Sequence, residues 1–179
     1  PWGLTEQRHS RSGLHRIYYV GDGPAELSEW GGKVAEALGL KGPVSKDDFE
    51  KLLDGKLPDG SVVNANANRR AGIDLTFSMP KSASLMIQLG GDKRVLEAQA
   101  SAVKSVMAYL EKHFAEARDY SRNANGEPVR TGNLVYALFQ HDTSRKLDPQ
   151  NHTHAVIAAM TQDKANKWKA LWNGEIWKN

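Results

Sequence analysis

Apolar residues at three- and four-residue spacing make the longest regular pattern in the chain. Because an α-helix repeats about every 3.6 residues, these residues fall on one side of a predicted helix of roughly 25 residues. Such a stripe is typical of a helix that packs against a sheet. The positions are Leu96, Ala100, Val103, Met107, Leu110, Phe114 and Ala117.

Two shorter helices are predicted from their start and stop signals. Ser28 precedes a helical pattern that ends near Gly39. Ser45 precedes a second pattern, which Gly55 ends. Serine is a favoured residue before the first turn of a helix, and glycine is favoured just after the last turn.

Three stretches have the alternation or composition of β-strands. Residues 73–78 alternate apolar and polar side chains, and Pro80 ends the run. Residues 133–141 and 152–160 are β-rich and are separated by ten polar residues. That connection is too short for a helical crossover, so the two runs should pair as antiparallel neighbours. We therefore expect an α/β (α+β) fold, with a central antiparallel sheet and helices packed on it.

The composition indicates one globular domain without disulfides. A chain of 179 residues that is 40% hydrophobic and 25% charged is ordinary for a soluble protein. No apolar run reaches the roughly 18 residues of a membrane span, so we expect a cytoplasmic protein that does not insert into membranes. Because there is no cysteine, a metal would need nitrogen or oxygen ligands. The net charge of +3 permits nucleic-acid binding without requiring it.

Three histidines are placed to converge at the end of the predicted hairpin. His152 and His154 are two residues apart, so they should project from the same face of a strand, about 7 Å apart. His141 ends the preceding strand and returns beside them if the strands pair. Three imidazoles supply three nitrogen ligands and leave positions for water or substrate. The alternative is that no metal binds, since a His-x-His pair alone is a weak signal.

Asp74 lies on the predicted strand 73–78, on the face opposite its apolar residues. A carboxylate there could orient a ligand imidazole, or it could act as the general base for a nucleophile. The alternative is an aspartate in solvent at the edge of a strand, which spacing alone does not exclude.

Several segments resemble those of a known family. Residues 72–82 (GIDLTFSMPKS) are similar to the strand motif of conjugative relaxases of the relaxase–helicase (MobF) class, in the histidine–x–histidine endonuclease superfamily. Residues 148–156 (DPQNHTHAV) resemble the three-histidine segment of that class. Further similarity, in the same order along the chain, lies at residues 131–135, 141–145 and 167–171.

The resemblance implies the palm fold of a relaxase and its chemistry. A tyrosine hydroxyl would attack a phosphate of single-stranded DNA at a plasmid transfer origin, form a 5′-phosphotyrosyl link, release a 3′-hydroxyl and later rejoin the strand. One divalent ion would bind His141, His152 and His154 and polarise the phosphate oxygens. We expect Mg²⁺ or Mn²⁺ in the cell, with Zn²⁺ or Ni²⁺ as alternatives. Asp74 matches the active-site aspartate of the family.

Tyr18 is the predicted nucleophile, with Tyr19 as the other member of the pair. Members of the class usually carry two tyrosine clusters near the N-terminus and cut with the first. This chain has one pair, which looks more like the second cluster, so either upstream residues are missing or one pair serves both steps. Without the resemblance, the two residues would be read as a β-prone pair packed under a loop.

Basic residues near these motifs are candidate phosphate contacts, although each could equally be a solvated surface charge. We expect residues 1–179 to form one relaxase domain. It should be incomplete at the C-terminus, where the family's domain extends further, and it could also lack residues at the N-terminus. The candidate DNA contacts are Arg69, Arg70, Lys81 and Arg145.

The resemblance also implies partners. They are single-stranded DNA of a transfer origin, other relaxosome proteins, and the coupling protein of a type IV secretion system, which would pass the protein with its DNA from a bacterial cytoplasm to a recipient cell. Two alternatives stay open. One is a vestigial relaxase domain that binds DNA without catalysis, and the other is a rolling-circle replication initiator or transposase of the same superfamily. The motif around Asp74 argues against the second.

Overall fold

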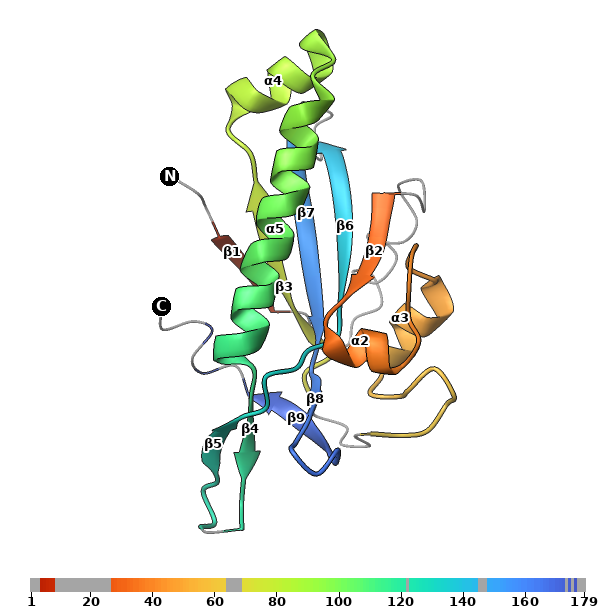
Figure 1. Ribbon diagram of the computed structural model, residues 1–179, viewed down its shortest axis with the longest axis vertical. Helices are drawn as coiled ribbons and strands as arrows, with labels where there is room; N and C mark the ends of the chain where they lie inside the picture. Colours follow the sequence, from red (N-terminus) through yellow and green to blue (C-terminus); the bar gives the residue numbers. More distant parts are fainter. Residues whose placement is uncertain are drawn as a thin grey trace.

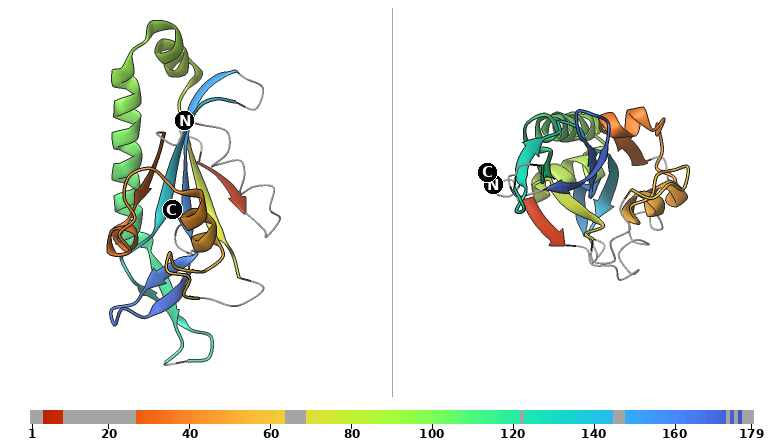
Figure 2. Two further views of the ribbon diagram at one scale, coloured as in Figure 1. Left: turned by 90° about the vertical axis from the view of Figure 1, so that its right-hand side faces the viewer. Right: turned by 90° about the horizontal axis from the view of Figure 1, so that it is seen from below.

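The computed structural model describes most of the chain (Figures 1 and 2). Tyr18, Tyr19 and Arg145 lie outside the described residues. None of the described helices is both long and apolar enough to cross a membrane. The described residues are 4–8, for the backbone alone, and 27–63, 69–121, 123–144, 148–172, 174 and 176.

A five-stranded sheet, in which all neighbouring strands are antiparallel, forms the centre of the fold. The predicted central antiparallel sheet is therefore confirmed. β7 lies in the middle of the sheet, and it pairs with β6 as the predicted hairpin requires. In spatial order the strands are β1 (Leu4–Arg8), β3 (Gly72–Ser78), β7 (Pro149–Ala158), β6 (Tyr136–Thr143) and β2 (Ser28–Gly31).

α5 (Lys93–Phe114) runs along one face of this sheet (Figure 1). Val103 and Met107 of the helix are buried against alternate residues of β3, β6 and β7, so the predicted apolar stripe is confirmed. The last position of the stripe is wrong, because the helix ends at Phe114 and Ala117 lies in a strand. An apolar residue three positions further on fits either element, and here pairing with two other strands decides.

α3 (Lys46–Leu53) covers part of the opposite face of the sheet. Phe49 and Leu53 pack there on apolar residues of β6 and β7. The helix ends as predicted, since Gly55 follows it with a φ of 74°, a left-handed conformation that favours glycine.

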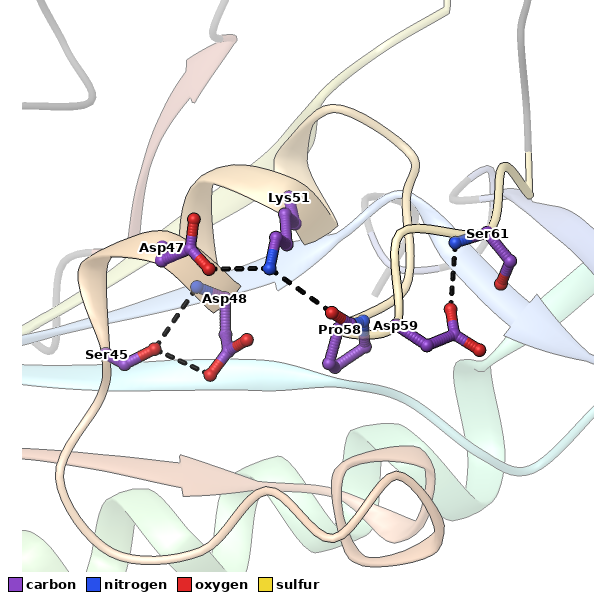
Figure 3. A network of polar contacts seen from close by, with 7 residues as sticks. All are labelled: Ser45, Asp47, Asp48, Lys51, Pro58, Asp59 and Ser61. Atoms are coloured by element: carbon purple, nitrogen blue, oxygen red, sulfur yellow. Dashed lines mark hydrogen bonds and ion pairs between the residues drawn. The ribbon is translucent and has the colours of Figure 1, made fainter.

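Polar contacts fix the start of α3 and the turn that follows it (Figure 3). The hydroxyl of Ser45 accepts a hydrogen bond from the backbone N–H of Asp48 at 3.2 Å, so the predicted serine cap is confirmed. One turn later, the ammonium of Lys51 lies 2.6 Å from a carboxylate oxygen of Asp47 and donates to the carbonyl of Pro58 at 3.2 Å. The bond to Pro58 ties the helix to the loop that follows it.

The predicted helix from Ser28 to Gly39 is only partly present. Its first four residues form β2, at the edge of the sheet, and the helix itself is α2 (Lys33–Ala37). Gly32 separates the two elements with a φ of 94°, and a Cβ there would lie 2.3 Å from the carbonyl oxygen of Leu134. The prediction is wrong for the first part because pairing with β6 overrides the local helical pattern.

Besides the edge strand β1, two parts of the fold are not predicted by the sequence patterns. One is α4 (Lys81–Gly90), which lies between β3 and α5. The other is a second sheet at the lower end of the molecule in Figure 1. In the turn between its first two strands along the chain, the backbone N–H of Gly126 donates to the carbonyl of Asn123. In spatial order the sheet consists of β5 (Glu127–Arg130), β4 (Glu116–Asp119), β9 (Trp168–Trp172) and β8 (Met160–Gln162).

Candidate metal centre

The pairing of β6 with β7 brings the three histidines together. His141 lies directly opposite His152, and His154 lies opposite Thr76 of β3. Side chains alternate between the faces of a strand, and the intervening residues of β6 and β7 pack against α5. All three imidazoles therefore lie on the face of the sheet away from α5.

The distances between the imidazole rings fit a shared metal ion. The ring centroids are 5.2 Å apart for His141 and His152, 5.4 Å for His141 and His154, and 5.0 Å for His152 and His154. An ion about 2.1 Å from one nitrogen of each ring, in tetrahedral directions, would place the centroids roughly 5 Å apart. Within the described part of the chain, no three His, Asp or Glu side chains already meet as a metal site. Binding would therefore require small adjustments of these side chains.

Hydrogen bonds orient two of the rings. The Nδ1 atom of His154 lies 2.9 and 3.1 Å from the two carboxylate oxygens of Asp74. The Nδ1 atom of His152 lies 2.9 Å from the carbonyl oxygen of Gln150. The carboxylate of Asp74 and the carbonyl of Gln150 are acceptors, so each of the two rings carries its proton on Nδ1. Nε2 is then the nitrogen that would bind a metal. Contacts of this kind are typical of metal-binding histidines.

Asp74 is fully buried beneath the histidine cluster. The alternative of an aspartate in solvent at a strand edge is therefore wrong for this fold, in which β3 has neighbours on both sides. The hydroxyl of Thr76 lies 3.2 Å from the same Nδ1 atom of His154, next to the carboxylate. Two side chains of β3 thus fix the orientation of one imidazole on β7.

Burial changes the protonation of one candidate ligand. It lowers the pKa of His152, because a charged imidazolium loses hydration there, and the hydrogen bond to Gln150 opposes this only in part. A lowered pKa favours the neutral imidazole, which is the form that binds metals.

The remaining candidate residues have different surroundings. Lys81 begins α4, is exposed, and lies 3.9 Å from a carboxylate oxygen of Asp148. Arg70 is exposed. The guanidinium of Arg69 donates to the carbonyl of Leu53 and its side chain is only 9% exposed, so the fold itself uses this group. The candidate nucleophiles Tyr18 and Tyr19, and the candidate DNA contact Arg145, are outside the described residues.

Two contacts of the cluster, Thr76 and Gln150, were not singled out from the sequence. Thr76 is two residues after Asp74, and Gln150 is two residues before His152. Each is therefore separated from its neighbour by the two-residue period of a strand. That period could have pointed to Thr76. The contact of Gln150 is made by its backbone carbonyl, for which side-chain patterns carry no signal.

A central antiparallel sheet that carries a His-x-His pair, a third histidine on the next strand and a buried aspartate has the architecture of a histidine–x–histidine endonuclease. The chain belongs to the TrwC relaxase family, whose family model matches residues 4–179. It therefore contains a conjugative relaxase domain of the relaxase–helicase class, as its motifs suggest, and the alternative of a rolling-circle initiator or transposase is set aside.

Relatives and solved structures agree with this family. The chain is 48% identical over 165 residues to the multifunctional conjugation protein TraI of Escherichia coli (strain K12). The matched region covers 90% of this chain and 9% of TraI. The metal-bound structure of the conjugative relaxase TrwC with oriT DNA matches with a TM-score of 0.89 and 40% identity, over 97% of this chain and 63% of that one. TrwC with a 27-mer DNA, comprising the recognition hairpin and the cleavage site, matches with a TM-score of 0.85 and 39% identity, over 97% and 61% of the two chains. The chain thus spans about a tenth of the length of TraI and less than two thirds of the solved relaxases.

Proposed function

We propose that this chain nicks and rejoins single-stranded DNA at a plasmid transfer origin, through a 5′-phosphotyrosyl intermediate and with one divalent metal. The observation that carries the proposal is the cluster of three imidazole rings, whose centroids are 5.0–5.4 Å apart. In this cluster Asp74 accepts a hydrogen bond from Nδ1 of His154. The DNA and metal seen with TrwC, a family member, support the same activity and substrate.

In this proposal His141, His152 and His154 hold the metal through Nε2 of at least the last two rings. When bound, the metal supplies positive charge beside the non-bridging oxygens of the scissile phosphate. Asp74 and the carbonyl of Gln150 keep the rings of His154 and His152 in the orientation and tautomer that ligation needs. Mg²⁺ or Mn²⁺ is the ion that we assign in the cell, with Zn²⁺ and Ni²⁺ as alternatives.

Tyr18 is the nucleophile in this proposal. Its phenolic oxygen forms a bond to phosphorus while the bond from phosphorus to the 3′ oxygen breaks, and the 3′ oxygen leaves as a hydroxyl once it gains a proton. A phenol has a reference pKa of about 10, so its proton must be taken by a base. Asp74 is fully buried and hydrogen-bonded to Nδ1 of His154, whose Nε2 would bind the metal. This favours a role in orienting that ligand over direct contact with the phenol, and the phenolic proton then passes to solvent water.

The DNA strand would lie over the histidine face of the sheet. Arg70 and Lys81 are the described basic candidates that are exposed for phosphate contacts, and Arg145 remains a third. The relaxosome proteins, the coupling protein of a type IV secretion system, and residence in a bacterial cytoplasm before transfer all follow from the same family assignment as proposals.

Incubation with single-stranded transfer-origin oligonucleotides tests the activity. The expected result is a covalent protein–DNA adduct that survives denaturation and requires a divalent metal. Tyr18→Phe removes one oxygen and should abolish the adduct, whereas Tyr19→Phe should retain it. An adduct lost only in Tyr19→Phe would move the nucleophile by one residue, and cutting by both variants would remove it from this pair. A chain that binds the oligonucleotide but never forms an adduct would favour the vestigial alternative.

A further inference from the structure

A β-bulge lies directly beside the histidine cluster. The pairing of β6 with β7 passes from His141 opposite His152 to Thr143 opposite Pro149. One residue of β6, Asp142, therefore faces two residues of β7. Bulges interrupt the regular ladder and re-aim neighbouring side chains, and they are common beside active sites. This one lies immediately after the first candidate ligand and immediately before the second.

Hydrogen bonds join α4 to both strands at the bulge. The hydroxyl of Ser84 accepts a hydrogen bond from the backbone N–H of Asn151 at 2.9 Å. The side-chain amide of Gln88 donates to the backbone carbonyl of Asp142 at 2.7 Å. Ser84 and Gln88 are four residues apart, so they lie on the same side of the helix. One side of α4 thus contacts the residue before His152 and the residue after His141.

The contact from Ser84 replaces a partner that the sheet does not supply. The carbonyl of Asn151 still pairs with the backbone N–H of Met79, just past the end of β3. The reciprocal bond of a regular ladder, from the N–H of Asn151 to the carbonyl of Met79, is not among the backbone bonds of the described residues, since the chain turns into α4 at Pro80. Ser84 is fully buried and provides the acceptor instead. A buried backbone N–H without an acceptor is strongly disfavoured, so the strand position depends on this hydroxyl.

We propose that α4 is a bracket that positions the metal-binding histidines, with Ser84 and Gln88 as positioning residues that hold the two sides of the bulge. The inference rests on the proposed function, because it assigns the bracket to the metal site. Gln150, whose carbonyl holds the ring of His152, is itself one of the two bulge residues of β7. A shift of the bulge would therefore move both a ligand backbone and the contact that orients its ring.

Cobalt titration of the whole chain tests the bracket. Ser84→Ala and Gln88→Ala should each weaken Co²⁺ binding about tenfold, in the range found for residues that support metal ligands. They should also change the visible absorption of the bound Co²⁺, which reports the geometry of its ligands. Ser82→Ala and Leu89→Ala are matched controls on exposed positions of the same helix, and they should bind as the unaltered chain does. Gln88 is exposed, so its variant should fold even if Ser84→Ala does not.

Amide hydrogen exchange on the metal-free proteins gives an independent readout. Ser84→Ala should speed the exchange of the Asn151 N–H, while Ser82→Ala should leave it unchanged. Binding by Gln88→Ala and Ser84→Ala with the affinity and spectrum of the controls would overturn the bracket while leaving the metal site intact. Failure of the unaltered chain to bind Co²⁺, Mn²⁺, Ni²⁺ or Zn²⁺ would overturn the metal site itself, and the bracket with it.

Discussion

The same three strands present very different surfaces on the two faces of the main sheet. Toward α5, the core residues of β3, β6 and β7 are apolar and buried, and Met107 of the helix is completely buried among them. The polar residues Gln140 and Thr153 lie on this face only toward the end of the strands that carries the histidines.

On the opposite face the side chains change from apolar to polar along the length of the strands. Phe139 and Val156 lie under α3. His154 lies directly opposite Phe139 and Asp74 directly opposite Val156, and the pair of His141 and His152 follows further along the strands.

The difference shows how one sheet separates stability from chemistry. Alternation along each strand assigns every second residue to one face, so the α5 face can be closely packed without constraining what stands on the other. On the histidine face α3 covers only part of the strands, and polar side chains occupy the part beyond it. Substitutions on the two faces should therefore fail in different ways: by unfolding on one face, and by loss of metal binding and cutting on the other.

The largest effect is expected from the ligands. His152→Ala or His154→Ala should weaken Mn²⁺ or Zn²⁺ binding by more than the roughly 100-fold that loss of a supporting contact costs, because two imidazoles would remain of three. His113→Ala, on α5, is the matched control and should bind normally. Calorimetric titration measures the affinities. Unchanged affinity in both ligand variants would remove the site from this face.

Asp74→Asn should act on the same face with a smaller effect. It keeps the shape of the side chain but loses the charge that holds the protonated Nδ1 of His154. We expect metal affinity to fall about 10- to 100-fold and the rate of adduct formation to fall about 10²- to 10⁴-fold. Binding of single-stranded DNA should persist. A variant that cuts at the normal rate would show that Asp74 is structural.

Met107→Ala tests the other face. Truncation of this fully buried side chain should lower the free energy of unfolding by about 2–5 kcal/mol, through lost burial and a cavity under α5. Metal affinity of the folded variant should stay unchanged. Urea denaturation and metal titration of the same preparation compare the two effects. A large loss of metal affinity at an unchanged unfolding free energy would contradict the separation of the faces.

The smallest effect is expected from pH. Metal binding requires neutral imidazoles, so affinity should decrease as pH falls from 8 to 5, through the usual histidine range near 6.5. Because burial lowers the pKa of His152, this ligand should stay neutral to a lower pH than a free imidazole. Its own protonation should therefore limit binding only toward the acid end of that range. Titrations at several pH values measure the profile, and a flat profile would mean that other groups bind the metal.

The elements that could be predicted are those whose own residues carry a period. The stripe of α5 and the alternation of β3 decide these elements locally, and the alternation of β7 also places the histidines on one face. α4 has the reverse pattern, because it buries Ser84 and leaves Leu85, Met86 and Leu89 exposed, so its apolar residues do not mark the side that packs.

The remaining features depend on partners distant in the chain. β2 is a strand only because β6 lies beside it, and the short strands of the second sheet depend on one another in the same way. In the site, the spacing of the histidines indicates a metal centre. The bulge at Asp142 and its bonds to α4 arise from tertiary contacts that no local pattern encodes.

The position of a bound metal is the most direct test of the three-histidine centre. A crystal of the chain soaked with Mn²⁺ or Co²⁺ should give one anomalous difference peak on the face of the sheet away from α5. The peak should lie about 2.0–2.2 Å from a ring nitrogen of each of His141, His152 and His154, and the nitrogen should be Nε2 for the last two. A peak elsewhere, or a peak on this face that lacks any one of the three imidazoles as a ligand, would contradict the account.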